Sequence, residues 1–135
     1  MNKGFSLLEL LMVVAIVGII TAIAYPGYRN HVTRVHRIDG QTALLDLANR
    51  MERYYAEHDT YQTGTDMLTN IASDGGWYKL SITQATNATY VLQATPISTQ
   101  ATNDKLCQSL TLTSSGVKDI TSAATAPTGN SRLCW

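Results

Sequence analysis

A long apolar stretch begins at residue 5, and shorter periodic patterns of apolar and polar positions follow it along the chain. Residues 5–25 contain one charged side chain, that of Glu9. As an α-helix this stretch would span about 30 Å, the thickness of a bilayer's hydrocarbon core. Lys3 precedes it and favours a cytoplasmic N-terminus. The pattern predicts a membrane-spanning helix at the start of the chain.

A helical pattern of a different kind continues beyond this stretch. Apolar residues recur at intervals near 3.6 as far as Tyr55, with most of the charged residues between them. Asp46 and Arg50 lie four residues apart, which favours an ion pair on one helix face. A helix over residues 5–57 would be about 80 Å long. A small domain covers only part of such a helix, so lipid or other subunits must bury much of it.

Four short segments after residue 76 alternate apolar and polar positions, as half-buried strands do. They are residues 78–83, 90–95, 109–113 and 117–121. Residues 58–76 are punctuated by Gly and Asn, Gly64 and Asn70 among them, and indicate a loop. Short strands separated by turns favour an antiparallel sheet with one face on the helix. The sequence therefore predicts an α+β fold, a long N-terminal helix packed on a sheet of about four strands.

Length and composition limit what the chain can do. Its 135 residues suffice for one compact domain. Ten Lys and Arg balance ten Asp and Glu, so no net charge attracts nucleic acid or an anionic membrane surface. The long aliphatic residues crowd into the first quarter, and the remainder builds only a modest core. Small cores usually need a covalent staple or a partner.

Cys107 and Cys134 supply a candidate staple. They lie too far apart for a CxxC redox motif, and a structural zinc site would need a second cysteine pair. If this part of the chain is exported, a disulfide is the natural interpretation. It would stabilise the fold by about 3–4 kcal/mol in the chain-entropy model. It would also pin the tail, which is rich in Thr, Ala and Ser, to the third strand.

Three interpretations of the apolar stretch compete. A secretory signal would be cut after the small-residue site Ala22-Ile23-Ala24, but the basic region before it is minimal and helical patterning continues past the cut. A plain signal anchor leaves Glu9 unexplained. The third interpretation, a precursor with a short leader, depends on Glu9 and the residues before it.

Glu9 itself has two interpretations. An ionisable residue inside a membrane helix costs about 2.5–3.5 kcal/mol on insertion scales, which indicates a functional site. Alternatively, Ser6 and Glu9 form an S-x-x-E capping box, in which the carboxylate only satisfies backbone donors at a helix start. The spacing alone leaves both interpretations open.

Residues 4–10, Gly-Phe-Ser-Leu-Leu-Glu-Leu, resemble the type IV prepilin signature: a short basic leader ending in Gly, then an aromatic residue, then Glu five residues into the mature chain. The resemblance continues through the apolar helix to Tyr25-Pro26-Gly27-Tyr28, which is similar to the pattern around the helix-bending proline of pilins. Residues 43–55 and the final Cys134-Trp135 also look like type IVa pilins. The similarity covers residues 1–60 well and the rest through the cysteine pair.

This resemblance implies that a membrane aspartyl peptidase cuts between Gly4 and Phe5 and methylates the new amine of Phe5. Glu9 would then lie in the apolar core of a filament, facing the Phe5 amine of a neighbouring subunit. Pairing the two charges relieves the cost of burying either alone. Pro26 lacks an amide hydrogen and should bend the helix. Gly18 is a second weak point or, equally, a place of close packing against another membrane helix.

The expected organisation is a leader over residues 1–4, a transmembrane and assembly helix over residues 5–28, and a globular domain over residues 29–135. The implied partners are other copies of the chain and other pilins, the prepilin peptidase and methylase, the inner-membrane assembly platform, and lipid before assembly. The chain would be a single-pass inner-membrane protein with a cytoplasmic N-terminus, and afterwards part of an extracellular pilus.

A basic cluster comes after the apolar stretch, formed by Arg29, His31, Arg34, His36 and Arg37. A solvated helix face is the simpler interpretation, and binding to lipid headgroups, DNA or acidic groups of another subunit is the alternative. His31 and His36 are five residues apart and share no helix face, so no metal site is expected. No cofactor motif or catalytic set is present in the sequence, and no enzyme activity is expected.

The favoured function is that of a structural subunit, major or minor, of a type IV pilus that serves adhesion, twitching motility or DNA uptake. A pseudopilin of a type II secretion system shares the N-terminal design and is the nearest alternative. A minor pilin that captures DNA is a further alternative, although the sheet domain has few basic residues: Lys79, Lys105, Lys118 and Arg132.

Overall fold

The structure is a computed structural model and describes residues 4–62, 71–121 and 131–135. Its elements are, in chain order, α1 (Leu7–His58), β1 (Tyr78–Ala85), β2 (Tyr90–Pro96), α2 (Ser98–Asn103), β3 (Ser109–Thr113), β4 (Lys118–Thr121) and α3 (Ser131–Cys134). The chain forms two compact units, Met1–Val32 and Thr33–Trp135, and α1 contributes to both.

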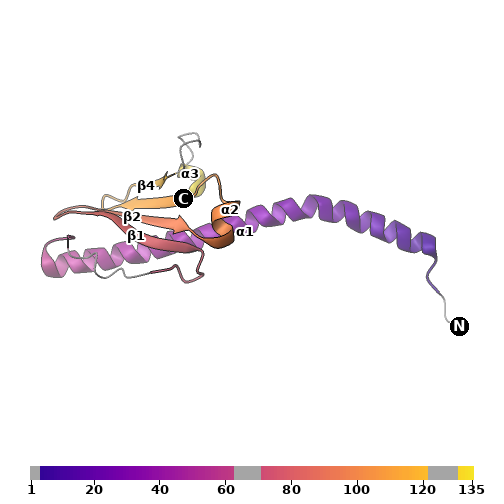
Figure 1. Ribbon diagram of the computed structural model, residues 1–135, viewed down its shortest axis with the longest axis horizontal. Helices are drawn as coiled ribbons and strands as arrows, with labels where there is room; N and C mark the ends of the chain where they lie inside the picture. The colour runs from indigo at the N-terminus through magenta and orange to yellow at the C-terminus, as the bar shows by residue number, and fades with distance from the viewer. Residues whose placement is uncertain (1–3, 63–70, 122–130) are drawn as a thin grey trace. The chain divides into compact units, whose positions relative to one another are not determined.

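In the unit Thr33–Trp135, the second part of α1 lies along a four-stranded sheet (Figure 1). The helix buries one face, on which Leu44, Leu47 and Met51 are at most 2% exposed. These residues recur at the 3.6-residue period of the predicted amphipathic pattern. The predicted pair of Asp46 and Arg50 is present on the exposed side, at 2.7 Å.

The sheet has the strand order β1-β2-β3-β4, and every neighbouring pair is antiparallel. The expected α+β fold with four strands is therefore confirmed, and the strand bounds agree with the sequence pattern within two residues. The β1–β2 connection is a tight turn closed by a hydrogen bond from the Thr86 amide to the Thr89 carbonyl. In the β3–β4 turn, Gly116 has a φ of +78°, a conformation that glycine adopts without strain.

The core forms where alternate strand residues meet the buried face of α1. Its strand members include Tyr78, Leu80, Leu92 and Leu110, all at most 5% exposed. Gly40 lets α1 approach this layer closely, because a Cβ at that position would lie 2.8 Å from the Tyr78 ring. This close approach was not predicted from the sequence.

Two short helices, α2 between β2 and β3 and α3 beside the second cysteine, were also not predicted. The expected turns at Gly64 and Asn70 lie outside the described residues, as do residues 122–130 of the tail. Among the described residues, the loop before β1 ends in a bridge between Ala72 and Lys79.

Candidate functional site

The predicted processing residues lie at and just before the start of α1. Gly4 and Phe5 precede the helix and Glu9 lies in its first turn. Phe5 is 80% exposed, and a Cβ built at Gly4 would meet no described atom within 4 Å. The described part of the chain thus leaves the Gly4–Phe5 bond accessible to a peptidase. Residues 1–3 lie outside the described residues.

The first part of α1 is apolar, and no other part of the described chain covers its apolar surface. This helix is long and apolar enough to cross a membrane, and no residue of its apolar window is buried within the chain. Leu7 is 77% exposed and Ile23 is 75% exposed. Exposed apolar surface costs about 25 cal/mol per Å² relative to burial. Lipid or other apolar helices must therefore cover this segment.

Gly18 and Pro26 lie within this same segment. The helix continues through Pro26, and a bend there stays a prediction. A Cβ on Gly18 would meet open space in the described structure, so its packing partner, if it has one, lies outside the described chain. The Thr21 hydroxyl donates a hydrogen bond to the Val17 carbonyl at 2.8 Å, so this hydroxyl is satisfied within the helix.

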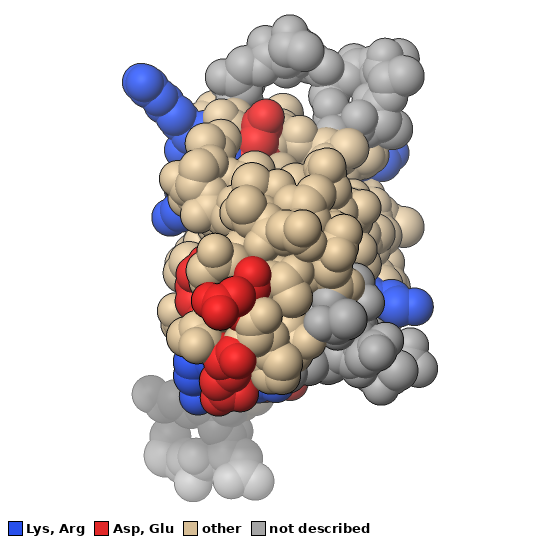
Figure 2. Space-filling model, turned by 90° about the vertical axis from the view of Figure 1, so that its left-hand side faces the viewer, with Lys and Arg blue, Asp and Glu red and all other residues tan. Residues whose placement is uncertain are grey.

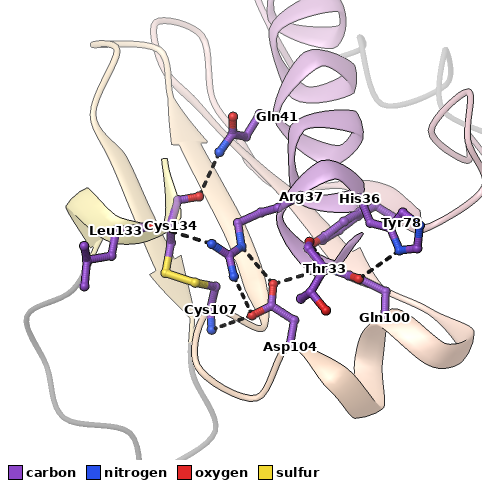
Figure 3. A network of polar contacts seen from close by, with 10 residues as sticks. All are labelled: Thr33, His36, Arg37, Gln41, Tyr78, Gln100, Asp104, Cys107, Leu133 and Cys134. Atoms are coloured by element: carbon purple, nitrogen blue, oxygen red, sulfur yellow. Dashed lines mark hydrogen bonds and ion pairs between the residues drawn. A yellow bond between two sulfur atoms is a disulfide. The ribbon is translucent and has the colours of Figure 1, made fainter. Parts of the chain in front are cut away.

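The unit Thr33–Trp135, which is the globular unit of the chain, contains a buried polar network beside the disulfide (Figure 3). Arg37 of α1 donates from Nε and Nη2 to the two carboxylate oxygens of Asp104, each at 2.9 Å. Arg37 also donates to the Leu133 carbonyl at 3.2 Å. The side chains of the ion pair are 10% and 1% exposed. The guanidinium thus ties α1 to the segment after α2 and to α3.

The disulfide between Cys107 and Cys134 is present, with a Cα–Cα distance of 5.6 Å. The same network holds both of its ends. The Cys107 amide donates to Asp104 at 3.2 Å, and Gln41 of α1 donates to the Cys134 carbonyl at 2.8 Å. The disulfide, the ion pair and α1 therefore form one connected structure in which each part orients the others.

Gln100 extends this network to the core. Its amide nitrogen lies 3.2 Å from the Thr33 carbonyl, 3.0 Å from the Tyr78 hydroxyl and 3.2 Å from Asp104. Burial raises the pKa of Tyr78 to about 12. His36 stacks on Trp77 with 3.7 Å between ring centroids and hydrogen-bonds to Gln100. These groups fix how α2 lies on α1.

This network corrects one sequence interpretation. Arg37 and His36 belong to the basic cluster that was expected to be a solvated helix face, but Arg37 is 8% exposed and His36 is half-buried. The periodicity contained the signal, because Arg37 lies seven residues before Leu44, on the same helix face. An arginine at an apolar position of the heptad indicates a buried partner, and its partner Asp104 has no periodic signal of its own.

A second polar contact pins the other end of α1. Glu52 accepts hydrogen bonds from the hydroxyls of Tyr61 at 3.0 Å and Tyr90 at 2.9 Å. Burial first, and then the hydrogen bond to Glu52, raises the pKa of each tyrosine. This contact joins α1 to β2 and the residues after the helix, which is a structural role.

The described residues contain no group of three or more His, Cys, Asp or Glu that could hold a metal ion. Among the described residues, the polar contacts of Arg37, Gln100 and Glu52 join the helices, the sheet and the segment beside the disulfide. The chain therefore has an apolar helix segment that lipid or other helices must bury, and a globular unit whose parts are held together by internal polar contacts.

A long N-terminal helix with an uncovered apolar start, packed on a four-stranded antiparallel sheet with a C-terminal disulfide, defines the class of type IV pilins. The chain belongs to the family whose model is described as "Type IV minor pilin ComP, DNA uptake sequence receptor", which matches residues 26–111. A second model, the prokaryotic N-terminal methylation motif, matches residues 1–25. Type IV pilins are structural subunits and not enzymes.

The chain is also similar to curated pilus proteins. It is 38% identical over 60 residues to the type IV major pilin protein PilA of Myxococcus xanthus, covering 44% of this chain and 27% of that protein. It is 35% identical over 75 residues to a fimbrial protein of Moraxella nonliquefaciens, covering 50% and 49%. With the type IV major pilin protein PilE1 of Neisseria gonorrhoeae it shares 29% identity, over 78% of this chain and 51% of that protein. These matches span about half or less of each relative.

Two solved structures share the fold. The non-core minor pilin PilV of Neisseria meningitidis aligns with a TM-score of 0.57 and 27% identity over 71% of this chain and 93% of that one. A type IV pilin from Shewanella oneidensis aligns with a TM-score of 0.52 and 24% identity, over 76% and 97%, which bears on the fold alone. The methylation motif and the apolar helix fit residence in the inner membrane and then in an extracellular pilus.

Proposed function

We propose that the chain is a subunit of a type IV pilus that is trimmed, held in the inner membrane and polymerised with other pilins. The observation that carries this proposal is the apolar first part of α1, whose side chains are uncovered within the chain. A membrane covers them before assembly, and a bundle of the same helices covers them in the filament. The globular unit then forms the outer surface. The methylation motif and the pilin relatives support this proposal over a secretory signal or a plain anchor.

The proposed processing site is the Gly4–Phe5 bond, and the proposed methylation site is the amine of Phe5. The leader would be residues 1–4, the membrane and assembly helix residues 5–28, and the globular domain residues 29–135. The peptidase supplies the cut, and the inner-membrane assembly platform supplies the transfer of subunits from lipid to filament. Pro26 and Gly18 would let the helix bend during that transfer, since one lacks an amide hydrogen and the other a side chain.

Glu9 is the proposed assembly residue. Cleavage creates a positive amine on Phe5, and Glu9 is the one anion of the apolar stretch. Burying either charge alone is strongly unfavourable, whereas a pair formed between neighbouring subunits compensates both. The ion pair therefore selects the axial register of one subunit against the next more than it adds stability.

Intact-mass analysis of the chain, extracted from membranes and from sheared pili, tests this proposal. A mass that begins at Phe5 with one added methyl group and an oxidised cysteine pair is expected. A mature chain that begins after Ala24, or an uncut chain in working pili, would overturn it.

DNA capture is a second candidate function, and the family model favours it, because its description names a DNA uptake sequence receptor. One face of the described surface gives it less support. Figure 2 shows one face on which acidic side chains gather while Lys and Arg reach only the margins. If the detergent-solubilised chain binds duplex DNA through phosphate contacts, its affinity should fall steeply with salt. An absence of binding at low salt would remove this candidate.

A further inference from the structure

A groove in the globular unit is rich in arginine and lies between the second part of α1 and the C-terminal segment. It has a volume of about 360 Å³. Its lining residues are Arg34, Arg37, Ile38, Gln41, Arg132, Leu133, Cys134 and Trp135. Three of them are arginines and none has an acidic side chain. Such a lining attracts an anion, because the three guanidinium groups of the groove face no described acidic side chain among the lining residues.

The three arginines differ in what already balances their charge. Arg37 is paired with Asp104 at the back of the groove. Arg34 and Arg132 are exposed, and neither forms an ion pair with a described residue. These two guanidinium groups are therefore available to an anion from outside, and planar guanidinium groups suit phosphate oxygens.

The rim of the groove is apolar and aromatic. Ile38 is 57% exposed and Leu133 is 62% exposed, on the two sides of the groove. Trp135 donates its indole N–H to the Asp119 carbonyl, and the Lys118 ammonium lies 5.0 Å from its ring centroid. Basic groups, an indole and exposed aliphatic side chains together are the composition of surfaces that lie at the membrane interface.

Chain connectivity brings this groove near a membrane. Arg34 lies only nine residues beyond Tyr25, the end of the apolar stretch, in the sequence. Arginine side chains extend towards headgroups while their stems pack on apolar groups. Tethering by the helix also keeps the effective concentration of headgroups high.

We propose that this groove binds the phosphate of an anionic lipid headgroup and docks the globular unit on the membrane surface before the subunit enters a filament. Arg34 and Arg132 hold the phosphate, and Ile38, Leu133 and Trp135 lie against the glycerol and upper acyl region. The proposal rests on residence of the chain in a membrane and goes beyond its role as a pilus subunit. In a filament the lipid is gone, and the groove is free for other contacts.

Two observations favour lipid over nucleic acid at this place. Specific protein–DNA interfaces are polar and strongly positive, whereas this groove is flanked by exposed aliphatic side chains. The sequence of the unit 33–135 also contains eight Lys and Arg against nine Asp and Glu, so no long-range positive field gathers free nucleic acid, whereas the apolar helix already tethers the unit to a membrane. A single phosphate next to an apolar surface fits both facts.

The test uses the full chain inserted in vesicles of phosphatidylcholine, with or without phosphatidylglycerol, and a nitroxide quencher on the headgroups. Trp77→Phe leaves Trp135 as the one tryptophan to report docking. The expected result is quenching of Trp135 that depends on phosphatidylglycerol. R34Q with R132Q should lower the docked-to-undocked ratio about thirty-fold, since each basic group near an anionic surface contributes a factor of about five. K79Q with K105Q, which removes two exposed lysines outside the groove, should leave it unchanged.

Equal quenching of Trp135 in R34Q with R132Q and in K79Q with K105Q would overturn the proposal. So would an absence of Trp135 quenching when phosphatidylglycerol is present. A third contradicting result is loss of DNA binding in R34Q with R132Q together with no phosphatidylglycerol-dependent quenching of Trp135, because the groove would then bind nucleic acid. Resistance of the chain to alkaline extraction reports insertion separately. A chain that is inserted but not docked contradicts this proposal and leaves the proposed pilus function intact, whereas a chain that does not insert contradicts both.

Discussion

Arg37 and Asp104 form a two-pronged ion pair in the interior of the globular unit, 67 residues apart in the sequence and joined by two hydrogen bonds of 2.9 Å. The pair lies where α1, α2 and the disulfide-linked C-terminal segment meet (Figure 3). Its energetic role is one of orientation. A buried pair gains little over an apolar pair of the same shape, but either partner alone is costly. The pair therefore fixes a single arrangement of the disulfide segment on α1.

Removing one member of this pair should destabilise the globular unit strongly. Asp104→Ala leaves the Arg37 guanidinium buried without its carboxylate, and the free energy of unfolding should fall by about 3–5 kcal/mol. Denaturant unfolding of the detergent-solubilised chain, followed by tryptophan fluorescence, measures this change. Asp46→Ala breaks an exposed pair with Arg50 and is the matched control, with an expected change of about 0.5 kcal/mol or less. Similar losses in the two variants would show that the buried pair has no special role.

Gly40 should tolerate no side chain. In Gly40→Ala the new Cβ would lie 2.8 Å from the Tyr78 ring, so α1 must shift away from the sheet. Overpacking of this kind costs about 1–3 kcal/mol, which exceeds the gain in helix propensity. Gly27→Ala, at a position with no described atom within 4 Å, is the control and should not lower the melting temperature of the globular unit. A Gly40→Ala chain as stable as the parent would refute the close approach.

The stability of the globular unit should fall at alkaline pH. Burial raises the pKa of Tyr78 from 10.0 to about 12, so the folded state holds the phenolic proton more tightly than the unfolded state. The associated stabilisation is complete below pH 10 and is lost as the pH rises from 10 to 12. Urea midpoints across this range, with tyrosinate absorbance as the titration signal, test it. Tyr78→Phe should flatten the decline in part, because the raised pKa of Tyr90 contributes separately. If the urea midpoint of Tyr78→Phe declines with pH as steeply as that of the parent chain, another group causes the decline.

Loss of the disulfide should weaken the C-terminal segment without unfolding the helix. The cysteines are 27 residues apart, and opening such a loop costs about 3–4 kcal/mol in the chain-entropy model. Cys107→Ser with Cys134→Ser should lower the free energy of unfolding by that amount. The backbone amide of Trp135, which donates to the Ser131 carbonyl in the C-terminal segment, should also exchange its hydrogen faster. Retained stability together with retained protection would show that the ion pair alone holds the segment.

Much of this fold can be predicted from local patterns in the sequence. The apolar stretch, the amphipathic period of α1 and the alternation in the four strands are repeated signals, and each predicted the element that the structure contains. What was missed depends on contacts between distant residues. Gly40 owes its importance to Tyr78, which its own neighbours do not indicate. The helical period places Arg37 on the buried face, but its partner Asp104 lies 67 residues away and could not be recognised from it. α2 lacks an apolar period because its one buried residue, Gln100, is polar.

The candidate functional residues likewise divide into those that a local motif predicts and those that only the fold brings together. Gly4, Phe5 and Glu9 form a compact motif that was recognised from a few residues, whereas the arginine groove is assembled from α1 and the last residues of the chain. Arg34 and Arg132 are 98 positions apart, and no sequence period links them. The described structure was needed to bring them together.

We propose that Glu9 matters to assembly and not to folding or insertion. The most direct measurement compares Glu9→Gln with the parent chain in the same cells, by quantifying the subunit in membranes and in sheared pili. Since glutamine keeps the size of the side chain but cannot balance a buried amine, membrane levels should be unchanged while the subunit in pili falls at least about tenfold. Pili that contain the Gln variant at the parent level would contradict the account.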